Sequence, residues 1–410
     1  MTNAPVTNAR TDRFFNFPVT ILIFASFMLG MSEFVVVGIL PDIASGLKIS
    51  EVTVGNLVAL FAFVYAPCTP IGSALSARFP RFATYLILMG VFLVGNILCA
   101  LAPNYPVLLI ARLLIASVSG TLVAISMTFA PDVTTDKYRT KFIAWVFSGF
   151  SIASVVGVPI GTWVANTFGW RVTFYLVSVL TAVLMISMAL VLPRNSHPAK
   201  IGFLRQFRLF FDRRIQLGVL DVVCGAAASY VFYTYLSPIM RDEIGVPEQY
   251  LSIGLVIYGC ACLWSNLYGG KLADKGRGVE PLTHIRPIYC VQAVCLCLLA
   301  FASLVPAAGA LLLVVLGMLM YLQNSASQVL YMDVAYQSHP GSVNLAASLT
   351  PCLSTSASPS VRRSAVWSTI SLDSPGWGRS VRYSHYSLLA SLHCCVRIFS
   401  GDLRARTALS

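Results

Sequence analysis

The stretch PVTILIFASFMLGMSEFVVVGIL, residues 18–40, decides the fold of this chain. Nearly all of its residues are apolar, and a helix needs about 20 apolar residues to cross the hydrocarbon core of a bilayer. Residues 1–17 are more polar, and the apolar run is longer than the core of a cleavable signal peptide. We therefore expect an uncleaved membrane-spanning helix at this position.

Composition indicates that most of the chain shares this environment. Apolar residues make up 57% of the 410 residues and charged residues only 11%, whereas soluble domains carry about 25% charged residues. The net charge of +12 does not indicate nucleic-acid binding, because the basic residues lie between apolar runs and not on one face. The expected partner of such a chain is the lipid bilayer, and we expect the protein to act as a monomer.

Apolar runs of spanning length recur along the chain and predict an all-α membrane protein. Glycines and prolines inside these runs are tolerated, because neighbouring helices satisfy the freed backbone groups. The predicted spans are 18–40, 53–76, 82–102, 107–130, 142–165, 172–193, 216–240, 250–273, 285–305 and 310–332.

The distribution of Lys and Arg over the loops predicts the orientation. Loops on the side of the N-terminus hold most of the basic residues, whereas the opposite loops hold only Lys48, Arg171 and Arg241. Positively charged loops stay in the cytoplasm, so we expect a cytoplasmic N-terminus.

A basic segment divides the chain into two similar halves. We expect a six-helix bundle at 1–193, a cytoplasmic linker at 194–215, and a second bundle at 216–349 with four spans and the start of a fifth. The loop after the second span, Ser73–Arg81, is related to the loop after the eighth, Gly270–Arg277. Such internal duplication is typical of transporters.

Four segments carry motifs, and together they resemble one family. They are Ser32-Glu33-Phe34 with 38–44; Ala111-Arg112-Leu113 with Gly120; Gly149 with Gly157, Pro159 and Gly161; and Gly270 with Asp274, Lys275 and Arg277. Over residues 17–350 they resemble the major facilitator superfamily, in particular its twelve-span drug and sugar efflux antiporters of the arabinose efflux permease-like type. The resemblance implies two six-helix bundles that expose a midplane site to each side in turn.

The first-half loop departs from that family pattern. Ser73, Ala77 and Pro80 stand where the family has Gly, Asp and Gly. A conformational latch that depends on the acid is therefore expected to be absent in the first half. In the second half, Asp274, Lys275 and Arg277 either form such a latch or are a solvated loop.

Three charged residues in the predicted spans are candidates for proton coupling. An ionised carboxylate at Glu33 would cost about 2.5–3.5 kcal/mol inside a span, so it should face a cavity or hold a proton; alternatively it lines a wet vestibule. Arg112 either organises a polar cavity or anchors its helix at the interface. Asp221 is either a similar group or a charge at a helix end.

Other candidates depend on packing or on an aromatic surface. Gly149, Gly157, Pro159 and Gly161 allow close and bent helix packing, whether for conformational change or for ordinary membrane packing. A group of aromatic residues in the seventh predicted span either lines a substrate cavity or belongs to the interfacial aromatic belt. These are Tyr230, Phe232, Tyr233 and Tyr235.

The sequence contains no P-loop and no Ser/His/Asp constellation, and we predict that the chain is not an enzyme. The cysteines in the apolar runs have no matching histidines and are interpreted as small buried residues, so no metal site is expected. Transport would need no cofactor and would use a proton gradient.

The chain changes character after Leu349. Residues 351–410 contain 14 Ser and 7 Arg but no Lys or Glu, where the family would place two further spans. A frameshift explains this: shifting a GC-rich back-translation of 358–369 by one base yields an apolar, glycine-rich helix. The alternatives are a genuine polar tail or a truncated paralogue. We therefore expect the last two helices to be missing.

These observations predict a secondary transporter of the bacterial inner membrane. The preferred function is proton-coupled efflux of a sugar or an amphipathic drug by alternating access. One alternative is proton-coupled uptake by symport. Another is an inactive product of a frameshifted transporter gene.

Overall fold

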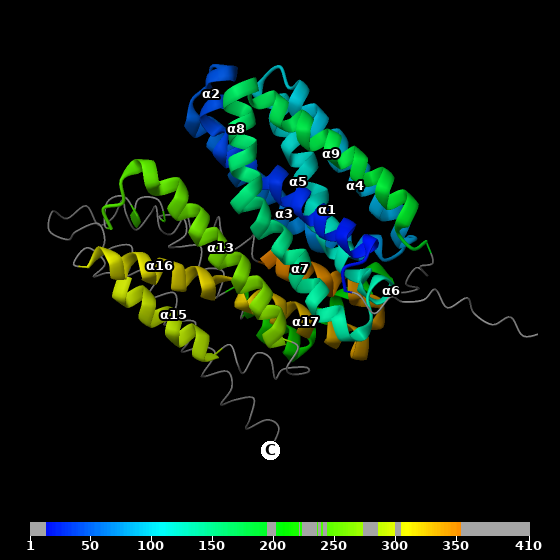
Figure 1. The fold of residues 1–410 in the computed structure, drawn as a ribbon. Coiled ribbons are helices and arrows are strands. Elements are labelled where there is room, and N and C mark those ends of the chain that lie inside the picture. Colours follow the sequence, from blue (N-terminus) through cyan, green and yellow to red (C-terminus); the bar gives the residue numbers. More distant parts are fainter. Residues whose placement is uncertain are drawn as a thin grey trace, which may run out of the picture.

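The computed structural model describes residues 14–194, 202–220, 222–223, 236, 239–240, 244–273, 286–299 and 305–353. Regular structure within these residues is helical throughout (Figure 1). Eight helical stretches among them are long and apolar enough to cross a membrane. The all-α membrane fold predicted from composition is therefore confirmed.

The first half is built from spans whose ends carry recognisable caps. Asn16 caps α1 (Phe17–Gly38) and Asn104 caps α5 (Tyr105–Thr128), each with its side-chain oxygen accepting a backbone N–H. The short α2 (Leu40–Leu47) follows α1. The remaining spans of this half are α3 (Glu51–Ser76), α4 (Arg81–Leu101) and α9 (Trp170–Val191).

The fifth span is interrupted at its centre. It consists of α7 (Arg139–Ile152), the π-helical turn η2 (Ala153–Gly157) and α8 (Val158–Phe168). Pro159 at the start of α8 lacks a backbone N–H, and its ring crowds the carbonyl four residues earlier, which explains a wider turn just before it. The short α6 (Ala130–Val133) and η1 (Asp136–Tyr138) precede this span.

The described part of the second half contains α13 (Glu248–Ala273), α15 (Arg286–Leu299), α16 (Pro306–Met320) and α17 (Leu322–Ser338). The structure extends the span predicted at 310–332 at both ends and divides it at Tyr321 into α16 and α17. After η5 (Pro340–Ser342), a helical segment continues through 343–353. The linker forms α10 (Phe203–Gln206) and η3 (Phe207–Phe211).

The two halves meet along specific helices. In the first half α5 packs between α3 and α4, while α1 packs against α7, η2, α8 and α9. In the second half α13 packs on α16 and α17, and it also contacts α7 of the first half. Figure 1 shows this arrangement, with α13, α15 and α16 on one side and α4, α5 and α9 on the other.

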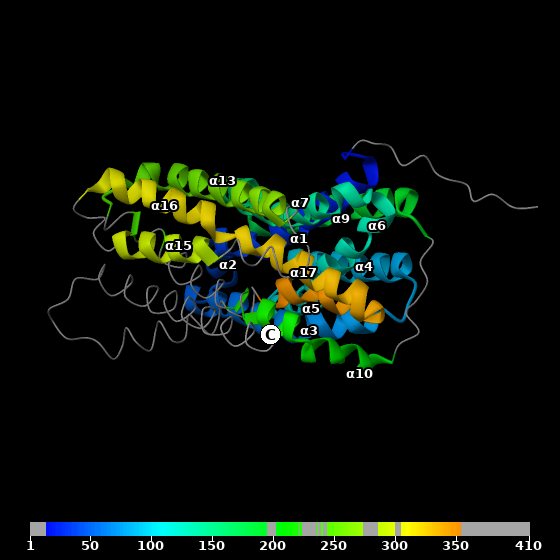
Figure 2. The ribbon, with the colours of Figure 1, turned by 90° about the horizontal axis from the view of Figure 1, so that it is seen from below.

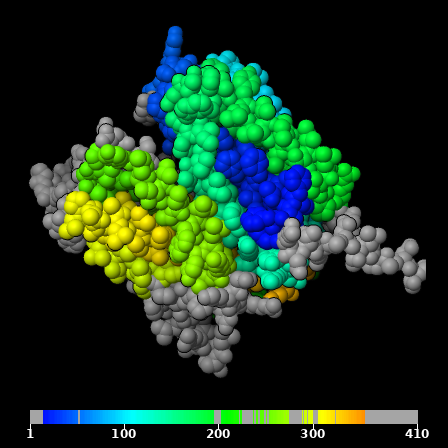
Figure 3. All heavy atoms as spheres, viewed as in Figure 1, coloured from blue at the N-terminus to red at the C-terminus, as the bar shows by residue number. Residues whose placement is uncertain are grey.

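The outer surface has the apolar character that lipid requires. On α9 the residues Val179, Val183, Ile186 and Leu190 are exposed and large. In the space-filling view this helix forms an outer edge of the molecule (Figure 3). Because hydrocarbon surrounds a membrane-spanning bundle, these exposed aliphatic side chains would contact lipid and not water.

Candidate functional site

Arg112 is the largest of the fully buried side chains in the described residues. It lies on α5, and only 1% of its surface is exposed. Its Nη1 atom donates a hydrogen bond of 2.7 Å to the carbonyl oxygen of Ser32, and Nη2 donates one of 3.4 Å to that of Glu33. A carbonyl oxygen has two lone pairs, so it can accept this bond as well as its own helix bond. The guanidinium therefore attaches α5 to the C-terminal half of α1.

An aromatic ring covers the same guanidinium. The Phe61 ring of α3 lies with its centroid 4.6 Å from Arg112 Cζ, which allows a cation–π interaction. Among the described residues, the Nε atom of Arg112 has no hydrogen-bond partner. The charged group of Arg112 therefore points into the bundle. Its role in organising a polar cavity stays a prediction.

Glu33 lies beside this arginine on α1. Its side chain is partly exposed, and it lies within electrostatic range of Arg112. Within the described part of the chain, Arg112 binds the backbone carbonyl oxygen of Glu33 and forms no ion pair with its carboxylate. An arginine is always charged, and it favours the ionised form of a nearby acid. Its role in proton coupling remains a prediction.

Asn96 of α4 completes the polar cluster. Its Oδ1 atom accepts a hydrogen bond of 2.8 Å from Ser32 Oγ, and its Nδ2 atom donates one of 2.8 Å to the carbonyl oxygen of Phe92. Asn96 is fully buried. Neither Asn96 nor Phe61 was singled out from the sequence. A lone amide inside the apolar run 82–102 was the signal that could have identified Asn96.

The glycine motif packs the fifth span tightly against α1. A Cβ atom on Gly149 would lie 2.9 Å from the backbone nitrogen of Phe27, closer than real contacts allow. A Cβ on Gly157 would lie 3.3 Å from Met31, and one on Gly161 would clash with Val35. The motif therefore lets the helix that carries Glu33 approach the π-helical turn, as small residues do in membrane helices.

Small and polar residues also join the two halves. Asn266 Nδ2 of α13 donates a hydrogen bond of 2.7 Å to Ser151 Oγ of α7. One turn away, Gly270 packs directly against Ala144. Gly270 is thus positioned in a helix at the interface between halves. Its predicted motif partners Asp274, Lys275 and Arg277 lie outside the described residues.

The altered loop of the first half has partners of its own. Arg81 forms an ion pair with Asp132, and its guanidinium lies 4.4 Å from the centroid of the Phe129 ring. At the end of α3, Ser76 Oγ accepts a hydrogen bond of 3.1 Å from Asn344 Nδ2 in the second half. Contacts across the halves are therefore present beside Ala77 even though the expected acid is missing.

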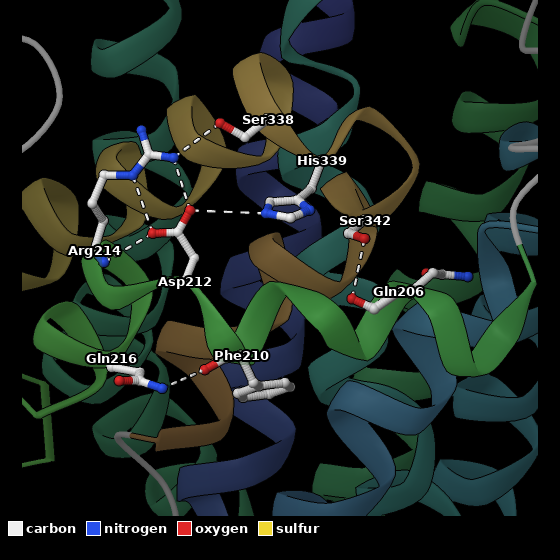
Figure 4. A network of polar contacts seen from close by, with 8 residues as sticks. All are labelled: Gln206, Phe210, Asp212, Arg214, Gln216, Ser338, His339 and Ser342. Carbon is white, nitrogen blue, oxygen red and sulfur yellow. Dashed lines mark hydrogen bonds and ion pairs between the residues drawn. The ribbon is translucent and has the colours of Figure 1, made fainter.

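A further polar network joins the linker to both halves (Figure 4). Gln206 Nε2 donates to the carbonyl oxygen of Ala74 at 3.0 Å, while Ser342 Oγ donates to the carbonyl oxygen of Gln206 at 3.1 Å. Arg214 forms an ion pair of 2.8 Å with Asp212, and its hydrogen bonds hold the pKa of Asp212 below its ordinary value. From the sequence, this segment was predicted only to be a basic linker.

Several predicted site residues cannot be placed. Asp221 and the aromatic residues Tyr230, Tyr233 and Tyr235 lie outside the described residues, as does the tail from 354 to 410. The structure brings together a smaller set of residues around α1. Ser32 and Glu33 belong to this helix, and it is contacted by Arg112, Asn96 and the glycines of the fifth span.

Curated relatives of this chain are transporters. The MFS-type transporter YtbD of Bacillus subtilis is 30% identical over 79% of this chain and 81% of its own length. The inner membrane transport protein YdhP of Escherichia coli is 29% identical over 63% and 67%, respectively. A chloramphenicol resistance protein of Streptomyces lividans is 29% identical over 69% and 73%.

A solved structure shows the same fold. The crystal structure of the Escherichia coli fucose:proton symporter FucP matches with a TM-score of 0.72, at 14% identity, over 94% of this chain and 98% of that one. The family model described as Major Facilitator Superfamily matches residues 22–359. This match confirms the predicted transporter class and excludes an enzyme. The chain belongs to the major facilitator superfamily.

Proposed function

We propose that this protein exports a small molecule, an amphipathic drug or a sugar, in exchange for protons across the bacterial inner membrane. The observation that carries the proposal is the attachment of the buried Arg112 to the backbone of α1 at Ser32 and Glu33. It places a permanent positive charge beside the acid that lies inside the first span.

This arrangement suits reversible proton binding. When Glu33 is ionised, its charge is attracted by Arg112, and the attraction is stronger in a bundle interior than in water. When Glu33 is protonated, the pair carries a net positive charge. The two states therefore differ in the electrostatic energy of the α1–α5 contact, and a proton gradient can drive a change in helix packing through that difference.

The moving parts would be the two packed halves. The contacts Gly270–Ala144 and Asn344–Ser76 lie toward the side where α1 begins. Asn16 at the start of α1 donates a hydrogen bond to Val133, and Arg81, which follows the end of α3, pairs with the neighbouring Asp132. The bond between Asn266 and Ser151 lies deeper, near the centre of the fifth span. With the N-terminus in the cytoplasm, as the loop charges indicate, this is a state closed toward the cytoplasm. Efflux would require these contacts to open and re-form.

The substrate class rests on the relatives. The chloramphenicol resistance protein supports an amphipathic drug as substrate, and drug resistance is explained by efflux and not by uptake. The sugar alternative rests on the resemblance to arabinose efflux permease-like proteins. The cellular location is supported by the inner membrane transport protein of Escherichia coli.

A flux measurement with a luminal pH dye tests the coupling. The full chain is reconstituted in vesicles that contain the dye, and radiolabelled chloramphenicol is added outside, followed in a separate sample by fucose. Exchange with protons raises the luminal pH as substrate enters, whereas symport lowers it, whichever way the protein is inserted. A fall in luminal pH would overturn antiport in favour of uptake. Substrate entry without any pH change would overturn proton coupling itself.

A further inference from the structure

The linker helix has an outer face with an unusual mixture of side chains. Leu204 and Phe211 are 80% and 81% exposed, and Arg205, Arg208 and Arg213 are exposed around them. Positions 204, 208 and 211 are spaced by four and three residues, so they share one side of the helix formed by α10 and η3. We call this the outer linker face.

The opposite side of the same helix is anchored to the bundle. Gln206 and Leu209, three residues apart, are fully buried. Gln206 Nε2 donates a hydrogen bond of 3.0 Å to the carbonyl oxygen of Ala74. Ala74 belongs to the last turn of α3, which ends at Ser76. The linker helix therefore lies at the depth where a span leaves the hydrocarbon, and Figure 2 shows α10 along the outer edge of the molecule beside α3.

Within the part of the chain that the structure describes, no acid pairs with the arginines of the outer linker face. Asp212 is the only acid in residues 202–220. Its carboxylate is occupied by Arg214 at 2.8 Å (Figure 4). Among the described residues, Arg205, Arg208 and Arg213 take part in no side-chain hydrogen bond or ion pair. Three free guanidinium groups and two large apolar side chains thus point away from the protein together.

We propose that the outer linker face binds the membrane itself, with its arginines on the phosphates of anionic phospholipids and Leu204 and Phe211 inserted among the acyl chains. An in-plane helix with aromatic and aliphatic residues beside arginines has the composition of an interfacial anchor. A guanidinium group can donate two parallel hydrogen bonds to phosphate oxygens. The aliphatic part of the arginine side chain can stay in the lipid while the charged group reaches the headgroups. If the outer linker face were only solvated, Leu204 and Phe211 would remain exposed to water next to acyl chains in which they could be buried.

The binding has a mechanical consequence. The inner side of the same helix touches the first half through Ala74 and the second half through Ser342, whose Oγ donates to the carbonyl oxygen of Gln206 at 3.1 Å. Lipid bound to the outer linker face would therefore stabilise a helix that contacts both halves. Anionic lipid is expected to favour the state in which these contacts are made.

Photoreactive lipids test the proposal on the full chain. The protein is reconstituted in phosphatidylcholine vesicles that carry a trace of photoreactive phosphatidylglycerol or photoreactive phosphatidylcholine, and labelled peptides are identified by mass spectrometry. We expect phosphatidylglycerol to label residues 203–213 in preference to phosphatidylcholine. Both leaflets have the same composition, so the result does not depend on the orientation or on any transport activity.

Paired variants give the quantitative prediction. Each basic residue near an anionic surface contributes a factor of about five to binding, so R205Q/R208Q should lower the phosphatidylglycerol preference roughly 25-fold. The control K137Q/K271Q removes two exposed basic residues from the same side of the protein, away from the linker. It should leave the preference at 203–213 unchanged.

A salt series on the unmodified protein provides a second test that does not rely on the variant folding. The Debye length falls from about 30 Å at 0.01 M salt to about 3 Å at 1 M, so the preference should shrink across this range. Equal labelling by both lipids at low salt would overturn the proposal. So would an equal loss in both double variants, or displacement of the lipid by inorganic phosphate when chloride at the same ionic strength has no effect.

Discussion

Arg112 Nη1 and the carbonyl oxygen of Ser32 lie 2.7 Å apart, although 80 residues of chain separate them. This bond joins the helix with the buried cation to the helix with the central acid. Both partners lie in the interior, where a hydrogen bond to a charged group is worth about 1.5–3 kcal/mol. The contact therefore holds α1 and α5 in one register and sets the distance at which the Arg112 charge acts on Glu33.

Arg112→Lys should fold but transport poorly. Lysine keeps the charge, but its compact ammonium cannot reproduce the fork that reaches both carbonyl oxygens. We expect the rate of pH-gradient-driven transport to fall about tenfold, as for a lost charge-assisted bond of roughly 1.4 kcal/mol. The matched control is Arg171→Lys, since Arg171 also donates to a backbone carbonyl, that of Ala102 at 2.9 Å, and lies over an aromatic ring. Equal losses in both variants would mean that Arg112 has no special role.

Gly149→Ala should destabilise the protein. The added methyl group would lie 2.9 Å from the Phe27 nitrogen, and backbone atoms cannot move aside as a flexible side chain can. Overpacking of this kind costs about 1–3 kcal/mol. The control is Gly55→Ala, where no atom lies within 4 Å of the new Cβ and the change should be neutral or stabilising by up to about 1 kcal/mol. Thermal unfolding in detergent compares the two, and an unchanged midpoint for Gly149→Ala would contradict the packing shown here.

The interface bond between Asn266 and Ser151 should appear as a coupling energy. A double-mutant cycle with Asn266→Ala and Ser151→Ala is expected to give about 0.5–1.5 kcal/mol in thermal unfolding. Ser154→Ala is the control, because Ser154 Oγ donates to its own helix at the carbonyl oxygen of Ser151. A cycle that couples Asn266 to Ser154 as strongly as to Ser151 would show that the hydrogen bond is not the cause.

The Asp212–Arg214 pair should make the linker sensitive to acid. The pKa of Asp212 is lowered in the folded protein, chiefly by its hydrogen bond from Arg214. Its contribution to stability is therefore present above the unfolded pKa of about 3.9 and is lost as the pH falls through the lower folded value. The pair is partly exposed, so the effect should stay below about 1 kcal/mol.

The measurement compares this protein with Asp212→Asn at pH 7 and below about pH 4. Both carry His339→Gln, which removes the imidazole whose Nε2 atom lies 3.8 Å from Asp212 Oδ2. The stability difference between the two should shrink toward the acid end. A difference that grows on acidification would contradict the sign of the shift.

The spans were predictable because their solvent is lipid. The predicted ranges 82–102, 107–130 and 172–193 agree closely with Arg81–Leu101, Tyr105–Thr128 and Trp170–Val191, since hydrocarbon requires an unbroken apolar helix. The π-helical turn before Pro159 and the break at Tyr321 were not predicted. Both depend on how the neighbouring helices pack, which local sequence does not record.

The candidate site was predictable only in part. Arg112 and Glu33 stood out because charges inside spans are rare. Their proximity could not be predicted, because Arg112 binds backbone carbonyl oxygens, which every residue has. Phe61 was missed because aromatic rings are common in apolar helices. Asn96 could have been identified as a lone amide in an apolar run, but its hydrogen bond from Ser32 appears only when α1 and α4 are packed together.

Glu33→Gln tests the central claim most directly, in vesicles that carry out both substrate exchange and pH-gradient-driven transport. Glutamine keeps the shape of the side chain but cannot bind and release a proton. We predict that exchange of labelled for unlabelled substrate continues while accumulation driven by the pH gradient is abolished, and that the surface variant Asp136→Asn retains both. Full pH-driven accumulation by Glu33→Gln would contradict the assignment of Glu33 as the proton-coupling residue.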